Sequence, residues 1–122
     1  MAHFEQEPGA ERVEKLLKAA RAGKTALYLC AVNLGEIYYS VLRERGAGKA
    51  DETLAILEQF PISIVNADKV LAVIAGTLKA SHPIAYADCF AAALAVQLNT
   101  RVVTGDPEFK KLENQVRVEW LV

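Results

Sequence analysis

The chain has 122 residues, of which 52% are hydrophobic and 24% are charged. That length fits a single domain over residues 1–122, and the apolar content is enough for a packed core, which excludes a long disordered protein. The 14 basic residues nearly balance the 15 acidic ones, so a general polyanion-binding module is disfavoured, whereas a nucleic-acid enzyme that uses metal ions is not.

The apolar periodicity predicts elements that alternate between helices and short buried strands. In chain order they are a helix at 8–23, a strand at 26–30, helices at 32–46 and 50–60, a strand at 62–65, helices at 68–80 and from about 85 to 96, a strand at 101–104, a helical turn at 106–112 and a strand at 116–122. Gly46 and Gly48 are expected to break the second helix. Helices between short strands imply crossover connections and a mostly parallel sheet covered on both faces, so the expected fold is α/β, a three-layer α/β/α sandwich.

The two cysteines and the chain's hydropathy indicate the compartment. Cys30 and Cys89 lie in apolar surroundings without a zinc-binding spacing, so we expect two unbonded core thiols rather than a disulfide. No stretch reaches the ~18 consecutive apolar residues of a membrane span. The N-terminus "MAHFEQEPG" lacks the basic start and apolar run of a signal peptide. We therefore expect a cytoplasmic protein without a membrane partner.

Three acidic residues follow or precede strands at positions where ligands bind in open parallel sheets. Glu36 lies in the helix directly after the strand at 26–30, and Asp106 directly follows the strand at 101–104. Connectivity alone therefore puts both at one edge of the sheet. Asp88 lies in the first turn of the helix "YADCFAAALAV", and connectivity does not decide whether that turn starts at the same edge.

Each acid also has a purely structural interpretation. Asp88 can favour the positive end of the helix dipole, although its neighbours leave it no exposed face. Asp106 before Pro107 is typical of an N-cap. Glu36 can be an exposed helix glutamate.

Considered together, the three acids predict a metal site. Carboxylates that meet in one cleft repel one another and have raised pKa values unless a cation neutralises them. Hard oxygen donors with no histidine or thiol nearby favour Mg²⁺ or Mn²⁺, which serve phosphoryl chemistry. We therefore interpret Glu36, Asp88 and Asp106 as metal-binding and catalytic residues.

The chain resembles the PIN domains of the VapC type, the toxin partners of toxin–antitoxin pairs. Four segments carry the resemblance, in the order and with the spacing of that family: "EPGAERV", "AVNLGEIYY", "IAYADCFAAALA" and "RVVTGDPEF". The resemblance implies an Mg²⁺- or Mn²⁺-dependent ribonuclease that acts on RNA, usually forms a homodimer and is inhibited by an antitoxin protein. It matches Glu36, Asp88 and Asp106 to metal-site acids and Thr104 to a supporting residue, and it implies that Asp88 lies at the acidic edge.

The sequence departs from the family at its front. Members normally open with a central strand that ends in an aspartate, and neither precedes "MAHFEQEPGA" here. The two neighbouring strands would then lie ~9.6 Å apart, too far for backbone hydrogen bonds. Three outcomes are open: the gene begins upstream of Met1, the sheet closes around the gap, or a partner chain supplies the strand. We expect the first, with the 122-residue form catalytically impaired.

A second interpretation belongs to another functional class. The same fold without catalysis would be an interaction module that binds an antitoxin-like partner or associates with itself. A melting temperature that does not respond to millimolar Mn²⁺, together with tight binding of a partner, would favour that interpretation over the nuclease.

Overall fold

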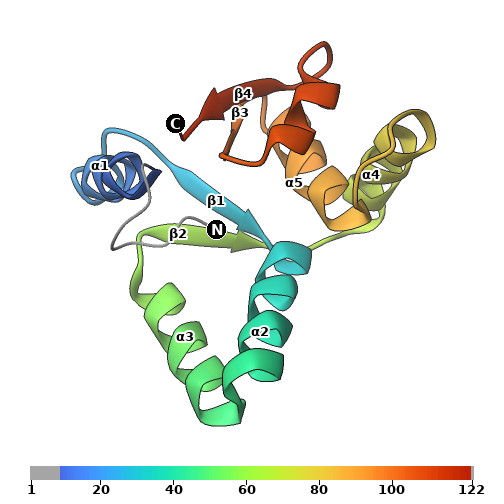
Figure 1. The fold of residues 1–122 in the computed structure, drawn as a ribbon. Helices are drawn as coiled ribbons and strands as arrows, with labels where there is room; N and C mark the ends of the chain where they lie inside the picture. Colours follow the sequence, from blue (N-terminus) through green and yellow to red (C-terminus); the bar gives the residue numbers. More distant parts are fainter. Residues whose placement is uncertain (1–8, 122) are drawn as a thin grey trace.

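The protein is an α/β domain with short parallel strands, and the computed structural model describes residues 9–121 (Figure 1). The helices are α1 (Gly9–Arg21), α2 (Ala31–Arg45), α3 (Ala47–Gln59), α4 (Lys69–Ser81), α5 (Tyr86–Gln97) and the 3-10 helix η1 (Pro107–Leu112). The strands are β1 (Leu27–Cys30), β2 (Ile62–Val65), β3 (Arg101–Thr104) and β4 (Arg117–Trp120). The order of predicted elements is confirmed, and the arrangement is consistent with the expected sandwich. Pro8, predicted at the start of the first helix, lies outside the described residues.

The break between α2 and α3 differs from the prediction. The chain turns at Gly46 alone, where φ is +87°, a backbone conformation that glycine adopts without a steric penalty. Gly48 lies in the first turn of α3 instead of ending a helix. Glycine in a helix interior costs only about 1 kcal/mol relative to alanine, so the favourable residues that follow carry α3 through this position.

Two parallel pairs of strands form separate sheets. In the first, β1 pairs with β2 and Leu27 lies opposite Ile62; in the second, β3 pairs with β4 and Arg101 lies opposite Arg117. No ladder joins β1 to β3 among the described residues, so each of these strands has a hydrogen-bonded partner on one side only. The outcome in which the sheet closes around the gap is therefore wrong.

A cleft of about 1000 Å³ lies between the two sheets. All four residues of β1 and all four of β3 line it, together with apolar residues of α1 such as Leu16 and Leu17. Unpaired strand edges are templates for pairing with another strand. The cleft is therefore bordered by apolar side chains and by two sheet edges that lack a strand partner among residues 9–121.

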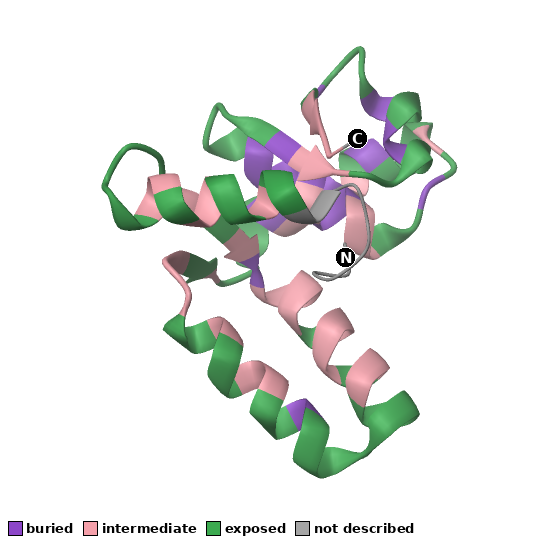
Figure 2. Ribbon diagram, turned by 60° about the vertical axis from the view of Figure 1, so that its left-hand side comes forward, coloured by how far each residue is buried: buried purple, intermediate pink, exposed green. Residues whose placement is uncertain are grey.

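Helix α5 forms the centre of the core. Its buried residues run from Cys89 to Ala95 with one partly buried position, and it contacts α4, α2, β1 and β3. Figure 2 shows the buried residues concentrated around α5 and its neighbours. In contrast, α2 has no fully buried residue and α3 has one, Ala50. The buried, unbonded thiols of Cys30 and Cys89 confirm the expectation for the two cysteines. Within residues 9–121, no helix combines the length and apolar character that crossing a bilayer requires.

The open edges generate a first prediction. We expect an extended apolar segment of about five residues, joined ahead of residue 1, to insert between β1 and β3 as a parallel strand and to raise the melting temperature. Each backbone hydrogen bond that it adds contributes about 0.5–1.5 kcal/mol. Thermal denaturation of the extended and the 122-residue chains measures the difference.

The matched control carries proline at alternate positions of the added segment, because proline cannot donate to a strand ladder. An equal rise in melting temperature for both extensions would contradict insertion as a strand. A rise that depends on protein concentration, with a dimer in size-exclusion chromatography, would show that the edges pair between copies instead.

Candidate functional site

Asp88 lies in the first turn of α5 and is partly buried. The next two residues, Cys89 and Phe90, are buried in the core, so the helix cannot rotate to expose the carboxylate without exposing them. The ring of Tyr86 contacts Phe90 edge to face, with a centroid separation of 5.0 Å. Packing of α5 therefore fixes the position of the Asp88 backbone.

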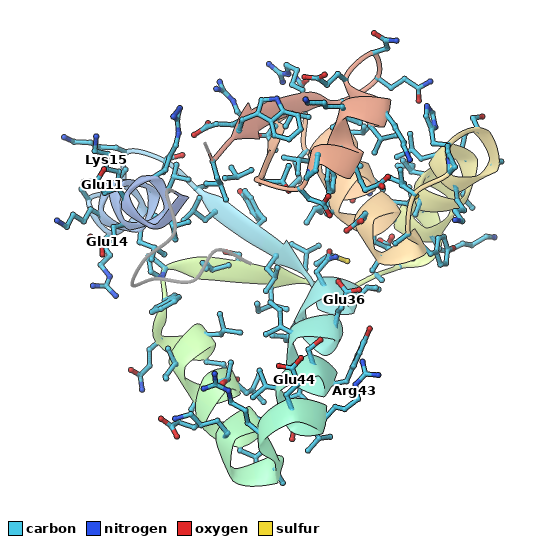
Figure 3. All side chains as sticks on the ribbon, viewed as in Figure 1. Glu11, Glu14, Lys15, Glu36, Arg43 and Glu44 are labelled. Atoms are coloured by element: carbon cyan, nitrogen blue, oxygen red, sulfur yellow. The ribbon has the colours of Figure 1, made fainter. Side chains whose placement is uncertain are left out.

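Glu36 lies on the second turn of α2, which begins immediately after β1. Its side chain is partly buried, which differs from the exposed helix glutamate of the structural interpretation. Figure 3 shows Glu36 toward the end of α2 that approaches α5, whereas Arg43 and Glu44 lie toward the far end of the same helix. The turn that joins β1 to α2 thus brings Glu36 to the sheet edge that connectivity predicts.

Asp106 follows β3 and is exposed. Its Oδ1 accepts a hydrogen bond of 2.9 Å from the backbone N–H of Glu108, which makes it the N-cap of η1. Its own backbone N–H donates to Thr104 Oγ1 over 3.0 Å. The structural role expected from the Asp-Pro pair is therefore present, and Thr104 supports the turn that holds the aspartate.

The three predicted acids line one cleft, the same cleft that separates the two sheets. The pKa of Asp88 is raised above its ordinary value, first by burial and then by the negative charges of Asp106, Glu36 and Glu108. The negative charges of these three neighbours thus oppose the ionisation of Asp88. Every contribution to the pKa shift of Asp88 disfavours its charge.

The donor chemistry at this rim suits a hard divalent cation. Within residues 9–121, no three or more histidine, cysteine, aspartate or glutamate side chains lie close enough together to hold a metal ion as they stand. Mg²⁺ usually keeps several water ligands and is bound by only one or two carboxylates, so a complete protein cage is not needed. Uncompensated carboxylates repel one another, and a cation is what would draw them together. The residues present therefore fit Mg²⁺ or Mn²⁺ by chemistry.

Sequence reasoning missed two residues near these acids. Glu108 contributes to the raised pKa of Asp88, and its place two positions after Asp106 was the available signal. Asn33 lines the cleft and donates from Nδ2 to the carbonyl oxygen of Ala87 over 2.9 Å. The sequence shows that Asn33 lies one helical turn before Glu36, but it does not reveal that Asn33 contacts α5.

Comparison with known proteins gives a family and a fold. A family model described as "PIN domain" matches residues 1–115. No curated protein matches the chain.

Solved structures with a similar fold include VapBC complexes from three bacteria. VapBC2 from Rickettsia felis, bound to a DNA fragment from its promoter, has a TM-score of 0.70 at 20% identity, covering 88% of this chain and 82% of that one. DNA-bound VapBC from Salmonella typhimurium has a TM-score of 0.74 at 17% identity, covering 97% and 87%. VapBC-1 from nontypeable Haemophilus influenzae has a TM-score of 0.68 at 19% identity, covering 95% and 86%. These likenesses show the fold.

The raised pKa of Asp88 generates a second prediction, for stability against pH. The ordinary value is 3.8, and the folded chain holds the proton more tightly than the unfolded chain does. The free energy of unfolding therefore falls as pH rises through the folded pKa and stays at the lower level at neutral pH. We expect Asp88→Asn, which stays uncharged, to melt at a higher temperature than the wild type at pH 7 in EDTA.

The difference in melting temperature between Asp88→Asn and the wild type should narrow as the pH is lowered toward the ordinary pKa of aspartate. Thermal denaturation between pH 7 and pH 4 measures this difference. Glu58→Gln is the matched control, because Glu58 is an exposed carboxylate of α3 outside the cleft. A surface substitution of this kind changes stability by no more than about 0.5 kcal/mol. An Asp88→Asn protein that is less stable than the wild type at pH 7 without metal would contradict the prediction.

Proposed function

The chain belongs to the PIN domain family, and from that premise we propose that it is a metal-dependent endoribonuclease, the toxin of a toxin–antitoxin pair. The observation that carries the proposal is the set of three carboxylates around one cleft, with the pKa of Asp88 raised by burial and by its acidic neighbours. A bound cation would relieve the repulsion among these carboxylates.

Glu36, Asp88 and Asp106 are the residues that would hold Mg²⁺ or Mn²⁺. When bound, the ion supplies an activated water and stabilises charge on the phosphate. The chain's own part is to hold its carboxylates in place: packing of α5 fixes Asp88, and the Thr104 contact and the cap of η1 fix Asp106. The substrate proposed for this site is the phosphodiester backbone of RNA.

The partners follow from the same proposal. An antitoxin protein would inhibit the nuclease, and this is supported by the likeness to the VapBC structures. Self-association as a homodimer is also proposed.

A second candidate function is a non-catalytic module that binds an antitoxin-like partner or itself. The edges of β1 and β3 that have no strand partner among residues 9–121 favour it, because such edges are templates for pairing with another chain. In this case the acidic cleft would be a surface for a partner and not a site of hydrolysis.

The third prediction separates these functions by a nuclease assay. We expect Mn²⁺ or Mg²⁺ to stimulate RNA cleavage, and Asp88→Asn and Asp106→Asn each to reduce it. We expect the loss of cleavage activity to be at least as large as the loss of about 10- to 100-fold that follows removal of a residue that supports metal ligands. Glu58→Gln, outside the cleft, should cleave at the wild-type rate. The assay is run on the 122-residue chain and on the strand-extended chain, since an incomplete sheet is expected to impair the shorter form.

Two results would contradict the nuclease. One is RNA cleavage that continues in EDTA, or that continues in both the Asp88→Asn and the Asp106→Asn protein. The other is the absence of cleavage by either chain, combined with a melting temperature that does not move in millimolar Mn²⁺ and with tight binding of a partner protein. That second result would establish the interaction module.

A further inference from the structure

The face of α2 that carries Glu36 continues along the helix with an aromatic and a basic side chain. Tyr39 and Arg43 follow Glu36 by three and seven residues, a spacing that puts all three side chains on one face of a helix. Figure 3 shows Glu36 and Arg43 on the same side of α2, whereas Glu44 points to another side. At a rise of about 1.5 Å per residue, Arg43 lies about 10 Å along the helix axis from Glu36. One surface therefore runs from the acidic cleft to a basic residue.

Tyr39 and Arg43 form a stacked pair on this surface. The guanidinium carbon of Arg43 lies 5.3 Å from the centroid of the Tyr39 ring, which is the geometry of a cation–π contact. Tyr39 keeps 49% of its surface exposed, and Arg43 is exposed as well. In the part of the chain that the structure describes, no carboxylate forms an ion pair with Arg43. The pair therefore offers a ligand both an aromatic surface and cationic N–H donors.

The neighbouring tyrosine and arginine of α2 are placed differently. The hydroxyl of Tyr38 donates to Oδ1 of Asp51 over 2.6 Å, which ties this side chain to α3. Arg45 follows Glu36 by nine residues, a rotation of about 180° at about 3.6 residues per turn, so it projects from the opposite face of the helix. Arg45 has the same charge as Arg43 without the shared face, which makes it a matched control.

The acidic cleft creates a need for contacts of this kind if the chain binds a nucleic acid. Glu36, Asp88 and Asp106 line the cleft, and the formal net charge of the chain is −1, so phosphates gain no general attraction. Affinity for a polyanion then has to come from cationic and stacking groups beside the cleft. An aromatic ring next to an arginine supplies both, because bases of a single strand stack on the ring and the guanidinium binds a phosphate. An apolar segment of a protein partner would instead bury the charge of Arg43 without pairing it, which is unfavourable.

We propose that Tyr39 and Arg43 form a contact site for single-stranded RNA, in which a base stacks on the Tyr39 ring and a phosphate binds Arg43. This inference rests on the proposed function and names the form of RNA that the cleft receives. The separation of about 10 Å between Glu36 and Arg43 equals about three nucleotides of a stacked strand, at about 3.4 Å each. The site selects unpaired RNA, because the bases of a duplex are not free to stack on a side chain.

The fourth prediction concerns the Tyr39 ring. Binding of a short labelled single-stranded RNA is measured by fluorescence anisotropy in EDTA, so that metal-dependent cleavage does not occur. We expect Tyr39→Ala to bind about 5- to 150-fold more weakly than the wild type, which corresponds to the loss of one stacked base. Tyr39→Phe keeps the ring and should bind as the wild type does. A duplex RNA of the same length should bind equally to all three proteins.

The charge of Arg43 is tested by the salt dependence of the same binding. For Arg43→Gln, the slope of log affinity against log salt concentration should decrease in magnitude by about 0.7, the value for one phosphate contact on a single strand. Arg45→Gln removes the same charge from the opposite face and should keep the wild-type slope. Because Tyr39, Arg43 and Arg45 are exposed, the melting temperatures of the variants should stay close to that of the wild type.

The proposal is overturned if Tyr39→Ala binds single-stranded RNA as the wild type does, or if Arg43→Gln and Arg45→Gln have equal salt slopes. A loss in Tyr39→Ala that is equally large for the duplex also overturns it, because an unpaired stacked base is then not the cause. The same holds if Tyr39→Ala dissociates a dimer in size-exclusion chromatography and leaves RNA binding unchanged, since the face is then an interface between copies of the chain. Should Tyr39→Ala fail to fold, the slope of Arg43→Gln decides.

Failure of the proposed function gives a different result. If the wild type binds single-stranded RNA through this pair but does not cleave it with Mn²⁺, the nuclease is wrong and the contact site is retained. If the wild type cleaves RNA and Tyr39→Ala has an unchanged KM and kcat, only the contact site is wrong. When both are correct, Tyr39→Ala raises KM and leaves kcat nearly unchanged, because a contact away from the reacting phosphate is made equally in the ground state and the transition state. A wild type that neither binds nor cleaves RNA contradicts both.

Discussion

Packing of α5 is the constraint on which the rest of the structure depends. This helix contacts both β1 and β3, which do not pair with each other, and it buries most of its residues between Cys89 and Ala95. Apolar burial along α5 therefore holds together two sheets that backbone hydrogen bonds leave apart. Because the first turn of the same helix carries Asp88, the core and the acidic cleft cannot be altered independently.

The position of Asp88 sets stability against function. Burial and three neighbouring carboxylates raise its pKa, so ionisation of Asp88 is less favourable in the folded chain than in the unfolded chain. The helix N-terminus offsets part of this, because its dipole favours a negative group by about 0.3–1 kcal/mol. Perturbed ionisable groups are concentrated at functional sites, where binding of a ligand compensates for the destabilisation. A divalent cation is the ligand that we propose for this arrangement.

The open sheet and the acidic rim are two parts of one cleft. It is lined by β1 and β3, whose facing edges have no strand partner in the part of the chain that the structure describes. Its acidic residues follow β1, begin α5 and follow β3. A change in the spacing of the two sheets would therefore move Glu36 relative to Asp106, since each is joined to a different sheet by a short connection. Completing the sheet and assembling the acids are thus coupled through the same backbone.

The sequence by itself determined whatever depends on near neighbours. Short apolar runs between amphipathic helices predicted the strands and their parallel order, and Asp106 before Pro107 predicted the cap that the structure shows. Glu36 could be placed at the sheet edge because it follows a strand directly. Only the tertiary structure decided that the first turn of α5, which carries Asp88, lies at the cleft that Glu36 and Asp106 also line. It also decided that Asn33 contacts α5 and that β1 and β3 do not pair with each other. These depend on how α5 packs between elements far apart in sequence, and no local pattern encodes that packing.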